Sequence, residues 1–318
     1  MLKVLLIKTS SLGDVVHNFP VASDIRRRFP DAQIDWAVEE AYAPLVALHP
    51  GIAGIIPVAI RRWRKRPLGA STWSEIGALR RQFGAEQYDA VIDTQGLLKS
   101  ALLARAARGR RHGFDAGSSR EGLAARTYDV RHHVARNLHA VIRNRMLAAS
   151  ALGYRVDTPA EFGIRAAAVE REGGQRRYAV FLHATSRIDK LWPIDRWIGL
   201  GRSLEARGIR CILPWGNDEE RRRSETIAQT LEKARVPPLA PISEVASMLA
   251  GSAVVVGVDT GLTHLAAALG VPVVGLFCGS DPALTGLYGA AHARNLGASG
   301  ELPELGSVLN TLCELGAA

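Results

Sequence analysis

The chain has 318 residues, of which 47% are hydrophobic and 22% are charged, and its formal net charge is +9. This length suggests about two domains, each able to bury a core of its own, and the composition excludes a disordered or collagen-like chain. The three cysteines (Cys211, Cys278 and Cys313) form no CxxC, zinc or paired-disulfide pattern, which favours a reducing compartment.

Strands and helices are predicted to alternate twice along the chain. In the first half, strands are predicted at 3–8, 34–38, 54–60 and 90–93, a helical segment at 15–28, and a helix at about 135–152 that ends at Gly153. In the second half, strands are predicted at 178–184, 209–214, 253–259 and 271–277, with helices at 193–208, from about 218 and from 260. This alternation predicts parallel sheets covered on both faces.

The stretch 157–177 lacks clean periodicity and contains Pro159, Gly173 and Gly174, so it is interpreted as a linker. We therefore expect two Rossmann-like, doubly wound domains, 1–160 and 175–318, that face a central cleft. Whether the last helix packs back on the first domain is left open. The chain has no run of about 18 uncharged apolar residues, and Lys8 interrupts its first apolar run. A soluble cytoplasmic protein without a signal peptide is expected.

The positive charge is concentrated in one stretch. Residues 51–150 contain 18 Lys+Arg and 7 Asp+Glu, whereas the rest of the chain contains 22 and 24. The densest part is Arg61-Arg62-Trp63-Arg64-Lys65-Arg66. Such asymmetry indicates an anionic partner, which can be nucleic acid, a membrane surface or a phosphorylated substrate. A solvated Arg-rich surface is the alternative. No nucleic-acid-binding signature is present.

Two segments that each follow a predicted strand and open a helix are candidate anion sites. One is Val258-Asp259-Thr260-Gly261-Leu262-Thr263-His264, in which hydroxyl and backbone N–H groups lie at the positive end of a helix. The other is Thr185-Ser186-Arg187-Ile188-Asp189-Lys190, which offers two hydroxyls and a cation. Each could instead be an ordinary helix cap or solvated loop, but together they favour one shared anionic ligand.

Two further segments contain acidic residues after a strand. Asp14 in Lys8-Thr9-Ser10-Ser11-Leu12-Gly13-Asp14 is either a helix cap or a carboxylate that accepts a proton. Asp218, Glu219 and Glu220 after Pro214-Trp215-Gly216 are candidates for binding ribose hydroxyls, although acidic residues are ordinary in the first turn of a helix. The glycine fingerprint of dinucleotide-binding proteins is absent, and so is any D-x-D pair, so neither a nicotinamide cofactor nor a metal-bridged diphosphate is supported.

Taken together, these segments resemble the ADP-heptose:lipopolysaccharide heptosyltransferases. The matching stretches are KTSSLGDVVH, VEE, PVAIRRWRK, YDAVIDTQGLLKSA, REGLA, YAVFLHATSR-DK-WP, LPWG and VDTGLTHL-AAL, in the order of the family. The resemblance implies a GT-B fold and an inverting transfer of L-glycero-D-manno-heptose from ADP-heptose to the first Kdo of Kdo-lipid A. It also implies a peripheral location on the cytoplasmic face of the inner membrane, with no cofactor, no metal and no nucleic-acid partner. The segment RRWRK argues against the branch that adds the second heptose.

Site residues carry over by motif. The resemblance makes Asp14 the catalytic base. The residues that it assigns to the donor are Thr185, Ser186, Lys190, Glu220, Asp259, Thr260, Gly261 and His264. The residues that it assigns to the acceptor are Ser10, Gly13, Arg61, Arg62, Arg64, Lys65 and Arg120. Ser186 stands where the family has the second threonine of a Thr-Thr pair, and this change keeps the hydroxyl. A non-enzymatic nucleic-acid-binding protein remains an alternative, but it leaves VDTGLTHL and TSRIDK unexplained.

Overall fold

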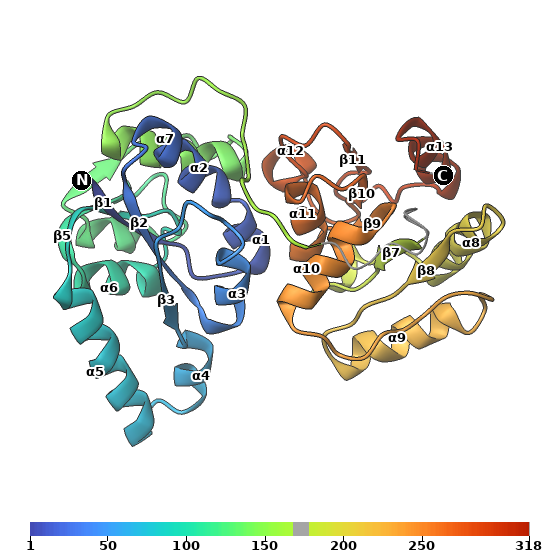
Figure 1. Ribbon diagram of the computed structural model, residues 1–318, viewed down its shortest axis with the longest axis horizontal. Coiled ribbons are helices and arrows are strands. Elements are labelled where there is room, and N and C mark those ends of the chain that lie inside the picture. The colour runs from blue at the N-terminus through green and yellow to red at the C-terminus, as the bar shows by residue number, and fades with distance from the viewer. Residues whose placement is uncertain (168–177, 318) are drawn as a thin grey trace. The chain divides into compact units, whose positions relative to one another are not determined.

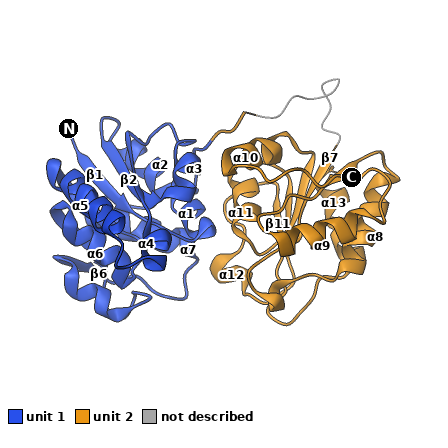
Figure 2. Ribbon diagram, turned by 90° about the horizontal axis from the view of Figure 1, so that it is seen from below, with its two compact units in different colours: residues 1–164 blue, residues 165–318 orange. Residues whose placement is uncertain are grey.

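The computed structural model describes residues 1–167 and 178–317. The chain divides into two compact units, Met1–Ile164 and Arg165–Ala318, which Figure 2 shows in different colours. This division falls inside the stretch 157–177 that the sequence marks as a linker, of which 168–177 lie outside the described residues. Each unit contains one parallel sheet, as predicted.

Unit 1 is built on a six-stranded parallel sheet with the strand order β3-β2-β1-β4-β5-β6 (Figure 1). Its strands are β1 (Lys3–Ile7), β2 (Gln33–Glu39), β3 (Gly54–Val58), β4 (Gln87–Asp93), β5 (Arg108–Phe114) and β6 (Val130–His132). In β1, Leu5 and Ile7 join a core cluster with residues of α5, and Val4 and Leu6 are equally buried. Because alternate side chains of a strand point to opposite faces, both faces of this sheet are covered.

The helices of unit 1 follow the strands in the expected alternation. They are α1 (Leu12–Val16), α2 (Phe19–Arg28), α3 (Ala43–Val46), α4 (Ile60–Lys65), α5 (Ala70–Ala85), α6 (Leu98–Ala106) and α7 (Ala140–Leu152), with 3₁₀ turns η1 (Glu40–Tyr42) and η2 (Gly122–Thr127). The segment predicted as one helix at 15–28 is two helices, because Pro20 begins a new one after Asn18. Helix α7 begins five residues later than predicted and ends at Gly153, whose φ of 74° fits the left-handed cap.

Unit 2 is built on a five-stranded parallel sheet with the order β11-β10-β9-β7-β8. Its strands are β7 (Tyr178–Leu182), β8 (Arg210–Ile212), β9 (Val254–Val258), β10 (Val273–Leu276) and β11 (Ala293–Leu296). Its helices are α8 (Ile194–Glu205), α9 (Asp218–Ala228), α10 (Ile242–Gly251), α11 (Gly261–Ala268), α12 (Pro282–Thr285) and α13 (Leu305–Glu314), with the 3₁₀ turn η4 (Ile188–Lys190). Helix α13 packs on α8 and β10 of its own unit, where Val308 and Leu312 join the core.

The strand orders decide where ligands can bind. In unit 1 the order reverses between β1 and β4, and in unit 2 it reverses between β7 and β9. Loops that leave the carboxyl ends of such strand pairs diverge to opposite faces of the sheet and open a crevice, which is the usual binding place in doubly wound domains. The predicted segments with Asp14, with Lys190 and with Asp259 follow β1, β7 and β9, so these three lie at the two places.

Candidate active site

Three loops of unit 2 converge on the carboxylate of Asp259, the residue that follows β9. The loop after β7 contributes Lys190, whose Nζ donates to Oδ2 over 2.6 Å. The loop after β10 contributes Ser280, whose Oγ donates to the same oxygen over 2.6 Å. Nε2 of His264, one turn into α11, lies 3.2 Å from Oδ1. The structure therefore brings the two predicted anion segments together, and it adds Ser280, which the sequence did not indicate.

The protonation state of Asp259 follows from these contacts. Burial alone would raise the pKa of its carboxyl, but the hydrogen bonds from His264, Lys190 and Ser280 hold that pKa well below its usual range. Asp259 is thus an anion at neutral pH. It fixes the ammonium of Lys190 at the carboxyl edge of the sheet.

The beginning of α11 provides backbone donors beside this ion pair. Thr260 occupies the N-cap with an extended backbone, and Gly261 is the first helical residue. In the loop after β7, the hydroxyls of Thr185 and Ser186 form no hydrogen bond with any residue that the structure describes. Hydroxyls, helix N–H groups and a cation at one sheet edge are the donors that a diphosphate requires.

Arg223 of α9 holds the loop after β7 in place. The guanidinium of Arg223 donates from Nη2 to the carbonyl oxygen of Trp192 over 2.6 Å and from Nε to that of His183 over 3.3 Å. These two carbonyls stand at the two ends of the loop that carries Thr185 and Lys190. Next to it, Ser224 lies 2.7 Å from Nε2 of His183. The sequence shows Arg223 only as one cation in a charged helix, so this role was not predicted.

Glu220 occupies the geometry of a helix cap. Its two carboxylate oxygens accept from the backbone N–H of Gly216 over 2.7 Å and from Nδ2 of Asn217 over 2.8 Å. Asn217 in turn caps α9 by accepting from the backbone N–H groups of Glu219 and Glu220. The loop after β8 is thereby held by hydrogen bonds to the first turn of α9. A role of Glu220 in binding ribose stays a prediction.

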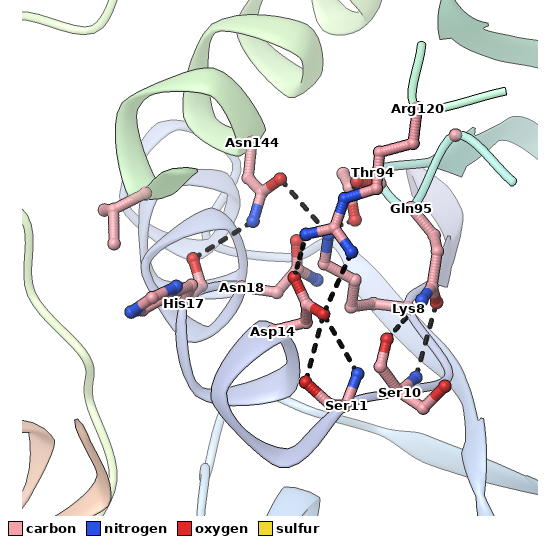
Figure 3. Close-up of polar contacts among 12 residues, drawn as sticks. Lys8, Ser10, Ser11, Asp14, His17, Asn18, Thr94, Gln95, Arg120 and Asn144 are labelled. Atoms are coloured by element: carbon pink, nitrogen blue, oxygen red, sulfur yellow. Dashed lines mark hydrogen bonds and ion pairs between the residues drawn. The ribbon is translucent and has the colours of Figure 1, made fainter. Parts of the chain in front are cut away.

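In unit 1 the carboxylate of Asp14 is held from two sides at the beginning of α1. Nη2 of Arg120 lies 2.5 Å from Oδ1, and the backbone N–H and hydroxyl of Ser11 donate to Oδ2 over 3.0 and 3.2 Å. Figure 3 shows these three donors converging on the carboxylate. The Asp14 side chain is 13% exposed, and that of Arg120 is 46% exposed. Ser11 is the N-cap of α1, and Asp14, the third helical residue, closes a capping box by accepting from Ser11. Asp14 also carries an ion pair that opens to water.

The charge state of Asp14 depends on a buried lysine. Burial would raise the pKa of the Asp14 carboxyl, but the charges of Lys8 and Arg120, with the hydrogen bonds, lower it to about 2. Lys8 is only 3% exposed, and its Nζ donates to the carbonyl oxygen of Thr94 over 2.6 Å. Its own pKa is lowered to about 8, chiefly by burial, against the opposing effect of Asp14. The lysine that interrupts the first apolar run is thus part of the site.

The loop before Asp14 is tied to the end of β4. Oε1 of Gln95 accepts from the backbone N–H of Thr9 over 2.7 Å and from its hydroxyl over 2.9 Å. The amide of Gln95 also donates to the carbonyl oxygen of Ser10, and Nζ of Lys99 donates to the Ser10 hydroxyl over 3.0 Å. Gly13 is the second residue of α1. Neither Gln95 nor Lys99 was predicted, although both stand in the quoted stretch YDAVIDTQGLLKSA.

A cavity of about 20 Å³ lies behind the carboxylate, lined by Lys8, Asp14, Arg120, Arg143 and Asn144 among others. This volume fits about one water molecule and no sugar. Asp14 therefore meets any substrate on its open side, where Arg120 also reaches solvent.

The basic cluster on α4 divides into two groups. Arg61 donates to the hydroxyl of Tyr42 over 2.8 Å, and Arg62 forms ion pairs with Glu40 at 3.0 Å and Glu75 at 2.7 Å. The cations that follow, at positions 64–66, form no ion pair with the described residues. No hydrogen bond joins α4 to Asp14 within the described ranges, so the predicted acceptor residues form two separate groups.

The described residues contain neither a metal-binding cluster nor a membrane-spanning helix. No group of three His, Cys, Asp or Glu side chains is placed to hold a metal ion. No helix in residues 1–167 and 178–317 is long and apolar enough to cross a bilayer.

Comparisons with known proteins identify the family. Residues 76–311 match the model of glycosyltransferase family 9 (heptosyltransferase). The chain is 45% identical over 293 residues to lipopolysaccharide heptosyltransferase 1 of Salmonella typhimurium, which covers 91% of this chain and 92% of the relative. The counterpart from Pseudomonas aeruginosa is 43% identical over 92% of this chain and 83% of the relative.

Solved structures agree with the sequence comparison. The structure of Escherichia coli heptosyltransferase WaaC with ADP superimposes with a TM-score of 0.90 and 40% identity, covering 99% of this chain and 100% of that chain. The same enzyme with ADP-2-deoxy-2-fluoro heptose gives a TM-score of 0.86 over 98% and 99% of the two chains. Escherichia coli ADP-heptose lps heptosyltransferase II shares the fold with a TM-score of 0.78 at 22% identity, over 99% and 98%. The two parallel-sheet domains predicted from the sequence are therefore confirmed, and the chain belongs to glycosyltransferase family 9, the heptosyltransferases.

Proposed function

We propose that this chain is an inverting heptosyltransferase that moves L-glycero-D-manno-heptose from ADP-heptose to the first Kdo of Kdo-lipid A. The observation that carries the proposal is 40% identity over 99% of the chain to a heptosyltransferase solved with ADP. The relatives that are 44–45% identical over 91% of the chain are lipopolysaccharide heptosyltransferases 1. Identity to heptosyltransferase II is only 22%, which favours addition of the first heptose over the second.

Donor binding is proposed for the second domain, 175–318. The diphosphate of ADP-heptose would lie at the carboxyl ends of β7 and β9, against Lys190 and the beginning of α11. The hydroxyls of Thr185 and Ser186, with the N–H groups near Thr260 and Gly261, are the remaining donors. Asp259 and His264 support the site by fixing Lys190. Negative charge develops on the diphosphate as the anomeric bond breaks, and preorganised donors stabilise it there.

Glu220 is proposed to bind the ribose. Its two oxygens already accept one N–H each, from Gly216 and from Asn217. A carboxylate offers about four acceptor positions, so two ribose hydroxyls can still donate to it. Glu220 follows β8, and doubly wound domains often have a carboxylate that binds ribose hydroxyls after a strand of the sheet.

Asp14 is proposed to be the general base. With a pKa of about 2 its carboxylate is ionised at cellular pH. As the acceptor hydroxyl attacks the anomeric carbon, its proton passes to Asp14, and the bond electrons between that carbon and the diphosphate oxygen leave with ADP. One displacement inverts the anomeric centre, so a single base suffices and no covalent intermediate forms.

Acceptor binding is proposed for the first domain, 1–160. Arg120 is half exposed beside Asp14 and can exchange part of its ion pair for the carboxylate of Kdo. Ser10 and Gly13 border the same place, and Arg61, Arg62, Arg64 and Lys65 on α4 would bind the other anionic groups of the acceptor. Because that acceptor is a lipid, the chain is proposed to work at the cytoplasmic face of the inner membrane as a peripheral protein.

A transfer assay tests this proposal. ADP-heptose is incubated with Kdo-lipid A and the chain, and the product is weighed by mass spectrometry. We expect a product with one added heptose and the release of ADP. No product with Kdo-lipid A, together with product from an acceptor that already carries the first heptose, would assign the chain to the second addition.

A further inference from the structure

Two large apolar side chains are exposed where α4 is joined to α5, Leu68 in the connection and Trp73 in the first turn of α5. Leu68 is 92% exposed, the highest value for a large hydrophobic side chain among the described residues, and Trp73 is 62% exposed. Figure 1 shows this connection at the lower end of unit 1, where α4 and α5 project beyond the sheet. A single exposed apolar side chain is ordinary, so the pair is informative only together with the charges and the ordered turn beside it.

The turn between α4 and α5 that exposes Leu68 and Trp73 is held by hydrogen bonds. The carbonyl oxygen of Arg66 accepts from the backbone N–H of Gly69 over 3.2 Å and from the hydroxyl of Thr72 over 2.8 Å, and Thr72 is buried. Nearby, Glu75 of α5 accepts from Nε1 of Trp63 over 2.8 Å, which joins the two helices. The inner side of the turn is thus fixed to the protein, and the apolar side chains are held outward.

Three cations without an ion pair to any described residue precede the apolar pair in the chain. Arg64, Lys65 and Arg66 form no ion pair within residues 1–167 and 178–317, whereas Arg62 on the same helix is held by two carboxylates. Cations flanking exposed Leu and Trp form the combination that partitions into the headgroup region of an anionic bilayer. Nucleic acid would use the cations but would leave Leu68 in water.

We propose that residues 64–73, here called the α4–α5 tip, dock on an anionic phospholipid bilayer. The cations contact lipid phosphates, and Leu68 and Trp73 enter the interface between headgroups and acyl chains. Each cation near such a surface and each apolar side chain removed from water strengthens the binding. The inference deepens the proposed function, on which it rests for the lipid nature of the acceptor, by naming the element that holds the enzyme at the membrane.

The test is co-sedimentation of the full chain with phosphatidylcholine–phosphatidylglycerol vesicles, with pure phosphatidylcholine vesicles for comparison. The double variant Leu68→Ser/Trp73→Ser and the single variant Arg66→Glu remove the apolar and the charged contributions. The matched control is Leu102→Ser on α6, because Leu102 is also an exposed leucine of unit 1, at 56%. The double variant is expected to lose at least about tenfold in partitioning onto the anionic vesicles. Arg66→Glu should lose several-fold, and Leu102→Ser should match the parent chain.

A transfer assay separates this inference from the proposed function. With a deacylated, water-soluble Kdo acceptor, the double variant should keep the parent rate, whereas with Kdo-lipid A in vesicles its rate should fall. If the parent chain transfers heptose but the double variant sediments with anionic vesicles as fully as the parent, the docking inference is wrong. Equal losses in Leu102→Ser, or equal binding to neutral and anionic vesicles, would also overturn it. Absence of transfer by the parent to either acceptor would instead refute the proposed function.

Discussion

Lys190 and Asp259 form an ion pair of 2.6 Å between the loops after β7 and β9 of unit 2. The pair is largely buried, with the lysine side chain 17% exposed and the aspartate 8%. It joins two segments that lie 69 residues apart in the sequence. The cation that we propose for the donor diphosphate is therefore positioned before any ligand arrives, which lowers the entropic cost of binding.

Replacing Lys190 should weaken donor binding. Lys190→Ala removes one charged hydrogen bond to the diphosphate, which is worth about 1.5–3 kcal/mol, so the ADP-heptose dissociation constant should rise roughly 10–100-fold. Calorimetric titration with ADP-heptose measures it. The matched control is Arg187→Ala, because Arg187 is a cation of the same loop that pairs with Asp189 and is 59% exposed. Equal losses in the two variants would mean that the loop supplies only diffuse positive charge.

Arg223 should act through the loop that it holds. Arg223→Met frees the carbonyls of His183 and Trp192, so the loop with Lys190 loses its fixed ends, and the KM for ADP-heptose should rise roughly tenfold with a smaller change in kcat. Arg223→Lys should restore only part of the affinity, because an ammonium cannot bridge both carbonyls in the same way. Steady-state kinetics of these variants and of Arg222→Met, the neighbouring exposed arginine, provide the measurement. An unchanged KM in Arg223→Met would show that the loop is held by other contacts.

The acceptor should depend on the free cations of α4. Arg64→Glu should raise the KM for Kdo-lipid A several-fold and leave ADP-heptose affinity unchanged, because the two substrates use different domains in this account. The effect should shrink at high salt, since exposed charges are screened over about 8 Å at physiological ionic strength and about 3 Å at 1 M. Arg80→Glu, the same charge change at an exposed position of α5, is the control. If the KM for Kdo-lipid A is the same in the wild-type chain and in both variants, the cations of α4 are solvated surface charges that do not bind the acceptor.

The ion pairs of Asp14 should make stability depend on pH in a defined direction. The pKa of Asp14 is lowered from 3.8 to about 2 on folding, so the stabilisation is present above pH 4 and is lost as the pH falls toward 2. Asp14→Asn should therefore reduce the free energy of unfolding by about 2 kcal/mol at pH 7. Urea denaturation at pH 7 and at pH 3 compares the wild-type chain with this variant. If the difference in the free energy of unfolding between the two proteins grows as the pH falls, the pKa of Asp14 is not lowered on folding.

Much of the fold is predictable because buried parallel strands have uniform apolar sequences. The stretch KVLLI of β1 is such a case. In contrast, β5 was missed because its sequence RGRRHGF is polar: Arg108 and Arg110 project outward, and only the last three residues are buried. Neither propensity nor periodicity identifies a strand of this kind, since its place is decided by pairing with β4 and β6.

The candidate site was predictable where a motif lies within one segment. Asp14, Lys190 and Asp259 each follow a recognisable strand. Lys8 and Arg223 were missed because their roles depend on partners far along the chain, Thr94 for the one and Trp192 for the other. A buried lysine is identical in sequence to a solvated one, and only tertiary packing separates them.

The central claim is that Asp14 takes the proton of the acceptor hydroxyl, and the kinetics of Asp14→Asn test it most directly. Asparagine keeps the shape of the side chain and an oxygen that can accept from the backbone N–H of Ser11, so α1 should remain formed. Turnover is measured at saturating ADP-heptose and Kdo-lipid A, alongside the dissociation constant of ADP-heptose. We expect kcat to fall about 10²–10⁴-fold while donor affinity stays within about twofold of wild type. If the variant transfers heptose at the wild-type kcat, Asp14 is not the general base.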